Sequence, residues 1–77
     1  MTLYSKPGCP QCKVLKTKMD RAGIEYKHIE DEDAIIALGA KAAPALVIED
    51  SLSVSTYSGP EAIKWFNQFV KEQMNGN

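Results

Sequence analysis

The stretch KPGCPQC (residues 6–12) contains both cysteines of the 77-residue chain and decides how its N-terminal half folds. Pro7-Gly8 is a pair that ends strands and forms loops, and it follows a short strand candidate at residues 2–4. Cys9 then takes the N-cap position of a helix, and Pro10 takes the first helical position, where its missing N–H has no cost. The sequence therefore predicts a strand, a tight loop and a helix that starts at the cysteine pair.

The rest of the chain alternates between strand and helix patterns. Apolar residues at three- and four-residue spacing predict that the first helix continues as far as Gly23, whose conformational freedom suits a helix end. Two more helices and three more strands are expected. The strands are expected at 26–29, 45–48 and 52–56. A short helix is expected to start in the acidic run 30–33 and to end at Gly39, and the last helix to follow a capping box formed by Ser58-Gly59-Pro60-Glu61, with the tail 75–77 fraying.

This order of elements indicates an α/β protein. A helix joins the first two strands, so they should be parallel with a right-handed crossover. A three-residue turn, Glu49-Asp50-Ser51, should join the last two strands as an antiparallel hairpin. The nearly continuous apolar run at 45–48 is typical of a central strand covered by helices on both faces. We therefore expect one domain, residues 1–77, with a thioredoxin-like four-stranded mixed sheet and three helices.

Charge is divided unevenly along the chain. The net charge is −1 from nine basic and ten acidic residues, which argues against a nucleic-acid partner. Residues 1–29 carry six cations and two anions, a net charge of +4, whereas residues 30–77 carry three cations and eight anions, a net charge of −5. The cysteine pair lies in the basic half. There, Lys13, Lys16 and Lys18 either steer an acidic partner segment towards Cys9 or form a solvated helix face.

The sequence shows neither a membrane-spanning pattern nor a secretory signal. The longest apolar run, 42–48, has seven residues and contains a proline, whereas a membrane-spanning helix needs about 20 apolar residues. Residues 1–6 lack the apolar region and the small-residue cleavage site of a secretory signal. We therefore expect a cytoplasmic protein without membrane contact, in a compartment where a close cysteine pair is more often catalytic or metal-binding than structural.

The Cys-x-x-Cys spacing at a helix start suits thiol–disulfide exchange. This reaction needs a thiolate nucleophile and a second thiol that attacks the mixed disulfide formed with the substrate. The positive end of the helix dipole and the free N–H groups at the N-cap favour the ionised form of Cys9, and Lys6 adds a cation. Cys12 lies one turn inside the helix and suits the resolving role. The expected catalytic residues are Cys9 and Cys12, with a redox-active disulfide between them.

Other interpretations of the cysteine pair make different demands. A closed structural zinc site needs four ligands, and beyond the cysteines His28 is the obvious nitrogen donor, so no metal site is predicted. His28 itself is more often a packed or solvated side chain than a catalytic base. A structural disulfide is unfavourable in a reducing compartment. An iron–sulfur cluster shared between two chains stays open, and it would make the protein a cluster carrier.

Four short segments carry a family resemblance that extends over nearly the full chain. They are Tyr4-Ser5-Lys6, Cys9-Pro10-Gln11-Cys12-Lys13, Ala42-Ala43-Pro44 and Tyr57-Ser58-Gly59. With these segments the chain resembles the glutaredoxin family. More narrowly it resembles the NrdH-redoxins, glutaredoxin-like electron donors to ribonucleotide reductase that favour a glutamine at the position of Gln11. The resemblance implies a glutaredoxin-type, thioredoxin-like fold.

The resemblance also implies roles for residues outside the cysteine pair. In glutaredoxins the proline that matches Pro44 follows a cis peptide bond and lies beside the active cysteines. The backbone of the residue before it, here Ala43, pairs with an extended substrate strand. The implied supporting residues are Lys6, Pro10, Gln11 and Pro44, and the implied substrate-binding residues are Ala43, Tyr57, Ser58 and Gly59.

Two departures from the family pattern bear on the reductant. Glutaredoxins that use glutathione carry Gly-Gly followed by aspartate near the last helix, and Ser58-Gly59-Pro60-Glu61 does not reproduce this pattern. NrdH-redoxins usually have Trp-Ser-Gly-Phe, then a basic or amide residue and a proline, whereas here Tyr57-Ser58-Gly59 leads directly into Pro60. The first departure argues against glutathione, and the second shortens the loop with which NrdH-redoxins meet thioredoxin reductase.

The residues and the resemblance together predict a monomeric dithiol–disulfide oxidoreductase that reduces protein disulfides. Ribonucleotide reductase is the expected substrate. Thioredoxin reductase is the expected reductant and glutathione the alternative, with electrons coming ultimately from NADPH through a reductase. No bound cofactor is expected.

Overall fold

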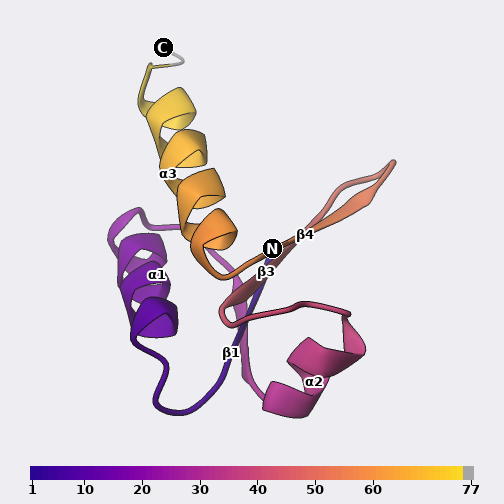
Figure 1. Cartoon of the computed structure of the whole chain (residues 1–77). Helices are drawn as coiled ribbons and strands as arrows, with labels where there is room; N and C mark the ends of the chain where they lie inside the picture. The colour runs from indigo at the N-terminus through magenta and orange to yellow at the C-terminus, as the bar shows by residue number, and fades with distance from the viewer. Residues whose placement is uncertain (76–77) are drawn as a thin grey trace.

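The computed structural model describes residues 1–75 and forms a four-stranded sheet in the order β2-β1-β3-β4. The first two strands are parallel, and the β1–β3 and β3–β4 pairs are antiparallel. Figure 1 shows α1 and α3 side by side on one side of the sheet and α2 on the other. The expected α/β fold with a mixed sheet is confirmed. The elements are β1 (Thr2–Ser5), α1 (Pro10–Arg21), β2 (Lys27–Glu30), α2 (Glu32–Ala37), β3 (Ala45–Glu49), β4 (Val54–Ser58) and α3 (Pro60–Asn75).

The core lies between the sheet and the helix pair α1 and α3. Leu3 of β1 and Leu46 of β3 are register partners, so both side chains face the same side, and both are fully buried. Each side chain of this size contributes about 1.5–3 kcal/mol when it is removed from water. The apolar spacing in α1 was a partly correct guide to the buried face, since Leu15 and Met19 are buried but Val14 is 47% exposed. The fully buried cluster consists of Leu3, Leu15, Met19, Leu46, Ala62 and Phe66.

The turn between β3 and β4 is longer than the sequence predicts. The Asp50 carboxylate accepts hydrogen bonds from the N–H groups of Leu52 and Ser53, both at 2.8 Å, and the Asp50 N–H donates to the Ser53 carbonyl at 3.0 Å. These bonds hold the backbone in a local turn that competes with strand pairing. Leu52 is therefore 94% exposed and precedes β4, and the prediction that the strand starts at residue 52 is wrong.

The start of α2 agrees with the predicted start in the acidic run 30–33, whereas the start of α3 does not agree with the prediction. The α2 helix begins at Glu32 because the Asp31 carboxylate accepts from the N–H groups of Asp33 and Ala34, at 3.0 and 3.4 Å. The residue before α3 is Gly59, with φ 59°, and Ser58 is the last residue of β4. A capping box needs Ser58 in the N-cap position, so that prediction is wrong.

Two further sequence-based expectations concern the extent of the chain. Within residues 1–75, no helix is long and apolar enough to cross a membrane. Residues 76–77 of the tail expected to fray lie outside the described part of the chain, and the assignment of residues 1–77 to one domain stays a prediction.

Candidate active site

The cysteine pair lies where β1 passes into α1. Gly8 turns the chain with φ 72°, a value that favours glycine, and Cys9 follows with extended backbone angles as the N-cap of α1. The two cysteines form a disulfide with Cα atoms 5.3 Å apart. Their Cys-x-x-Cys spacing and the N-cap position of Cys9 are therefore as the sequence predicts.

The two sulfur atoms differ in their surroundings. The Cys9 Sγ atom accepts a hydrogen bond from the backbone N–H of Cys12 at 3.1 Å. In the reduced protein this N–H and the positive end of α1 favour a thiolate at Cys9. Cys9 is partly exposed, whereas Cys12 is 5% exposed. An incoming disulfide therefore has better access to Cys9.

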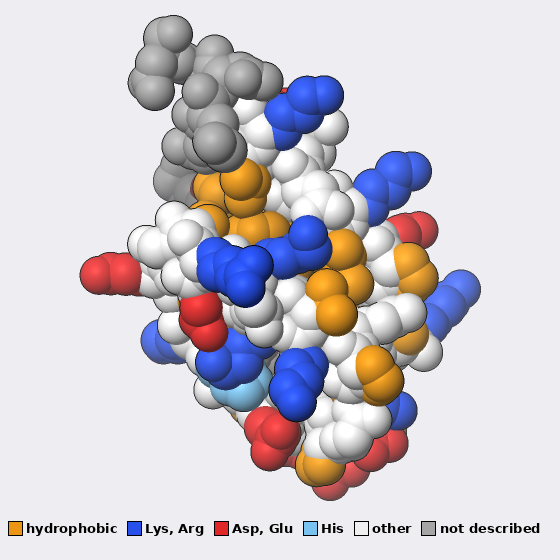
Figure 2. Space-filling view, turned by 90° about the vertical axis from the view of Figure 1, so that its left-hand side faces the viewer, with side chains coloured by type: hydrophobic (Ala, Val, Ile, Leu, Met, Phe, Trp, Pro, Cys, Tyr) orange, Lys and Arg blue, Asp and Glu red, His pale blue; other side chains and the backbone are white. Residues whose placement is uncertain are grey.

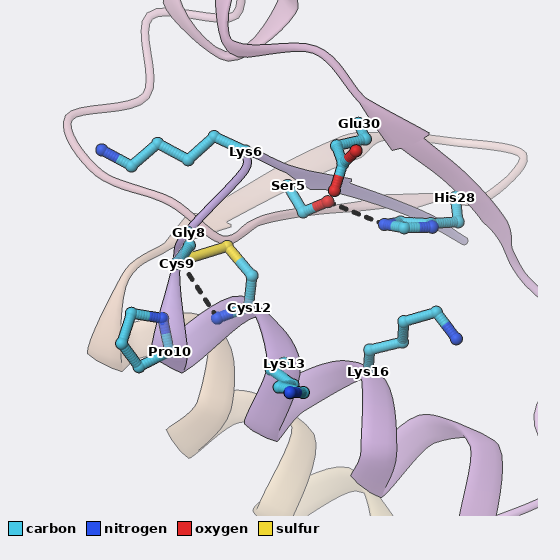
Figure 3. Close-up of a pocket in the computed structure, with 10 residues that line it drawn as sticks. All are labelled: Ser5, Lys6, Gly8, Cys9, Pro10, Cys12, Lys13, Lys16, His28 and Glu30. Carbon is cyan, nitrogen blue, oxygen red and sulfur yellow. Dashed lines mark hydrogen bonds between the residues drawn. A yellow bond between two sulfur atoms is a disulfide. The ribbon is translucent and has the colours of Figure 1, made fainter.

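An open cleft of about 570 Å³ borders the disulfide (Figure 3). It is formed by the end of β1, the first turns of α1 and the edge strand β2. Four residues expected at the site line this cleft: Lys6, Cys9, Pro10 and Cys12. The lining also includes Lys13 and Lys16, which one of the two sequence-based interpretations places near Cys9. Residues not expected there complete it: Ser5, Gly8, His28 and Glu30.

The face of the molecule around the cleft is rich in cations. Figure 2 shows lysine and arginine side chains gathered over the side on which α1 lies. A second shallow groove on α1 is bordered by Lys13, Lys18 and Arg21, and the exposed side chain of Val14 also lines it. A cationic surface next to a reactive sulfur raises the rate of encounter with acidic partners. Three cations of the basic half of the chain, Lys6, Lys13 and Lys16, thus line the cleft that borders the disulfide.

A small polar network fixes Lys16 at the side of the cleft. Asp20 accepts a hydrogen bond from the Tyr26 hydroxyl at 2.6 Å and forms an ion pair with Lys16 at 3.0 Å. The bond from Tyr26, followed by the bond from Lys16, lowers the pKa of the Asp20 carboxyl below its ordinary value. The hydrogen bond to Asp20 is also the largest cause that raises the pKa of Lys16.

This network predicts an acid-sensitive part of the stability. Because the pKa of Asp20 is lower in the folded protein than its ordinary value of 3.8, the unfolded chain binds the proton more readily. The contribution of Asp20 is therefore present above about pH 4 and is lost as the pH falls through the folded-state pKa. We expect Asp20→Asn to make the fall in melting temperature between about pH 4 and pH 2 shallower, and Tyr26→Phe to do so in part. Thermal melts over this range test it, and an unchanged pH dependence in Asp20→Asn would contradict it.

The segment before β3 is joined to the start of α3. The Ala43–Pro44 peptide bond is cis, as the family resemblance implies. Tyr4 pairs with Ala45, so the antiparallel register brings buried Pro44 opposite Ser5, at the end of the sheet from which the chain leads to the cysteines. The Pro44 carbonyl accepts a hydrogen bond from the Gly59 N–H at 2.8 Å. Gly59 therefore anchors the loop that contains Pro44.

Replacement of Gly59 is expected to disturb this junction. Gly59 has φ 59°, and a Cβ atom there would lie 3.2 Å from the Ala42 Cβ. We expect Gly59→Ala to lower the free energy of unfolding by about 1–2 kcal/mol for the backbone conformation, and further for the contact. The matched control is Gly23→Ala, since Gly23 has φ 71° with nothing within 4 Å of the added atom. Urea unfolding of both variants measures the difference, and equal losses would show that the approach to Ala42 has no effect.

The remaining expected residues lie away from the cleft lining. Gln11 is exposed on α1, and Ala43 is half-buried next to Pro44. The Tyr57 ring stacks on Trp65 of α3 with centroids 5.4 Å apart, so this side chain packs against the helix. Ser58 pairs with Ala45 in the β3–β4 ladder. The supporting role of Gln11 and the substrate-binding roles of the others stay predictions.

No group of three or more potential metal ligands occurs among the residues that the structure describes.

One pair of residues at the site was missed by reasoning from sequence. Ser5 and His28 are hydrogen-bonded at 2.7 Å across β1 and β2. In this parallel pair Leu3 is opposite His28 and Ser5 is opposite Glu30. Side chains two residues apart share one face of a strand, so Ser5 and His28 both face α1. The contact between Ser5 and His28 could be predicted only after the register of β1 and β2 was known.

The fold and the site together define a class of protein. A thioredoxin-like sheet with a Cys-x-x-Cys disulfide at the N-terminus of its first helix is the arrangement of a thiol-disulfide oxidoreductase. The glutaredoxin family model matches residues 1–52, and the chain belongs to the glutaredoxin family. Its substrates are accordingly protein disulfides, and a reductant partner restores the dithiol. A comparison with curated proteins gave no match.

Proposed function

We propose that this glutaredoxin is a dithiol electron donor to a ribonucleotide reductase in the cytoplasm, recycled by thioredoxin reductase with electrons from NADPH. In the proposed cycle the Cys9 thiolate attacks the substrate disulfide and forms a mixed disulfide. Cys12 then attacks the Cys9 sulfur, which releases the reduced substrate and leaves the Cys9–Cys12 disulfide. No bound cofactor takes part, and the protein acts as a monomer.

The observation that carries the proposal is the unequal placement of the two cysteines. Cys9 is partly exposed at the N-cap and its sulfur accepts the Cys12 N–H, whereas Cys12 is buried behind it. The attacking thiol benefits from exposure and from a stabilised thiolate, and the resolving thiol benefits from protection against the wrong partner. The geometry of the helix start therefore supports the proposed order of attack.

The start of α3 supports a reductant other than glutathione. Ser58-Gly59-Pro60-Glu61 lacks the Gly-Gly-Asp pattern by which glutathione-using family members hold their ligand. Glu61 lies exposed in the first turn of α3, and with Lys41 it borders a groove next to the loop before Pro44. Gln11, which NrdH-redoxins favour, points to the same subfamily.

The cationic face supports an acidic protein segment as the substrate. Lys6 and Lys13 line the cleft beside the disulfide, and the α1 groove with Val14 on its floor continues from Lys13. A segment with acidic and apolar residues next to its own disulfide matches both features. An acidic partner segment is also one of the two interpretations that the sequence allows for the lysines of the first helix.

Recycling assays distinguish the two reductants. The oxidised protein is supplied either with NADPH and thioredoxin reductase or with NADPH, glutathione and glutathione reductase, and NADPH consumption is followed with a protein disulfide as substrate. Faster recycling by thioredoxin reductase is expected. Faster recycling by glutathione would overturn the proposed reductant without affecting the assignment to the oxidoreductase class.

The same assay with oxidised ribonucleotide reductase as the substrate tests the proposed partner. We expect deoxyribonucleotide formation to depend on the protein and on Cys9. A ribonucleotide reductase from the same source that receives no electrons from the reduced protein would contradict the proposal.

A further inference from the structure

A hydrogen-bonded serine–histidine pair lines the same cleft as the buried cysteine. The Ser5 hydroxyl and the His28 Nε2 atom are 2.7 Å apart. Ser5 is 4% exposed and Cys12 5% exposed, whereas His28 lies on the exposed edge strand β2. All three residues line the same cleft, and Figure 3 shows the Ser5 side chain between the disulfide and the His28 ring. The pair thus leads from the region of the buried sulfur to solvent.

The proposed resolving step needs such a connection. Cys12 attacks the mixed disulfide only as a thiolate, so its thiol must lose a proton first. Burial disfavours the charged thiolate, and Cys12, at 5% exposed, has little contact with water, the usual proton acceptor. A serine hydroxyl both accepts and donates a hydrogen bond, and histidine is the side chain that ordinarily changes its charge between pH 5 and 8. Ser5 and His28 therefore have the chemistry of a proton relay.

We propose that Ser5 and His28 carry away the proton of the Cys12 thiol during resolution, a role that rests on the dithiol function proposed above. The Cys12 thiol gives its proton to the Ser5 hydroxyl while the Ser5 proton passes to the Nε2 atom of His28. The Cys12 thiolate then attacks the Cys9 sulfur. The Cys9–Cys12 bond forms, and the bond between Cys9 and the substrate sulfur breaks. The substrate leaves as a thiolate with the bonding electrons, and the imidazolium returns its proton to that thiolate or to water.

The charges around the pair suit both products of the transfer. A carboxylate stabilises a neighbouring imidazolium, and cations stabilise a neighbouring thiolate. Asp20, which is ion-paired with Lys16, interacts electrostatically with His28, and Glu30 lines the same cleft. The charged groups around the pair are Glu30 from β2 and Lys13, Lys16 and Asp20 from α1, whereas the side chain of Lys6, which also lines the cleft, points away from the pair (Figure 3).

The proposal is tested by following the two steps separately. The reduced protein is mixed with the aromatic disulfide dithiobis(nitrobenzoate) in a stopped-flow instrument. The first equivalent of thionitrobenzoate reports attack by Cys9, and the second reports resolution by Cys12. We expect His28→Asn, which can still accept a hydrogen bond from Ser5, to slow the second phase at least about tenfold, since acid–base groups typically contribute 10²–10⁴-fold. The first phase should change less than about twofold, because no proton relay serves Cys9.

The pH dependence and a series of variants separate a relay from a structural role. The pH dependence of the second phase should differ between the native protein and His28→Asn, because the variant lacks the group that accepts the proton. Ser5→Thr keeps the hydroxyl and should resolve at the native rate, whereas Ser5→Ala should behave like His28→Asn. The matched control is Lys27→Gln, on the same strand but facing the opposite side, which should leave both phases unchanged.

Each outcome decides the proposal. An unchanged second phase and pH profile in His28→Asn would overturn it. Equal slowing of both phases would also overturn it, because this would show a loss of charge or structure and not of proton transfer. If the variants release two thionitrobenzoate equivalents, whether fast or slowly, the dithiol function is intact. Failure of the relay is therefore distinguishable from failure of the proposed function.

Discussion

Cys9→Ser is expected to abolish the reduction of a protein disulfide. In a single-turnover assay without added thiol, the native dithiol should reduce one substrate disulfide per molecule. Without Cys9 the exposed nucleophile is lost, and Cys12 is 5% exposed at the bottom of the site. We expect the rate to fall by at least about a thousandfold, as it does when other enzymes lose their nucleophile. Detection of released substrate thiols with a fluorescent alkylating reagent measures this loss.

Cys12→Ser is the matched control for this prediction. It removes a sulfur of the same disulfide but leaves Cys9, its N-cap position and the Cys12 backbone N–H that contacts its sulfur. The initial attack should therefore continue at a rate within a few-fold of the native value. A Cys9→Ser variant that still reduces the substrate at a native-like rate would assign the attack to Cys12 and reverse the proposed order.

Phe66→Ala is expected to have the largest effect on stability. Phe66 of α3 is 1% exposed and belongs to the fully buried cluster between the helices and the sheet. Truncation of a buried phenylalanine costs about 3–5 kcal/mol, because it loses apolar burial and leaves a cavity. A chain of this length has a total stability of about 4–12 kcal/mol, so the variant should lose between about a quarter and all of it. Urea unfolding followed by circular dichroism gives the value.

The control for Phe66→Ala lies on the opposite side of the same helix. Lys64 is exposed, and Lys64→Ala should change the free energy of unfolding by less than about 0.5 kcal/mol. The pair of variants also tests whether α3 is part of the folding unit, since the family model covers only residues 1–52 and α3 begins at Pro60. A loss below about 1 kcal/mol in Phe66→Ala would show that α3 adds little to the core.

Local rules predicted the parts of the fold that depend on neighbouring residues. Pro10 after Cys9 and the spacing of apolar residues were enough for α1, because a helix start and a buried helix face are set within a few turns. The apolar run at β3 correctly indicated a central strand. The cis peptide bond before Pro44 came from the family resemblance and not from the composition of the loop.

The predictions of the start of β4 and of the cap of α3 were wrong because a polar residue there could take part in either of two local structures. Asp50 looked like an ordinary turn residue, but its carboxylate binds two backbone N–H groups and keeps Leu52 out of the strand. Ser58 was taken as a helix cap, but it pairs in β4 instead. The Ser5–His28 pair depends on the register between two strands that are 23 residues apart in sequence, which local patterns do not define.

The most direct test of the central claim is the intact mass of Cys12→Ser after reaction with a disulfide-bonded peptide of known mass. The claim is that Cys9 attacks and Cys12 resolves. It predicts one covalent peptide adduct per protein molecule, located at Cys9 by proteolytic mapping and released by dithiothreitol, whereas the native protein should end as the peptide-free disulfide. The absence of an adduct, or full turnover in both single cysteine variants, would contradict the claim.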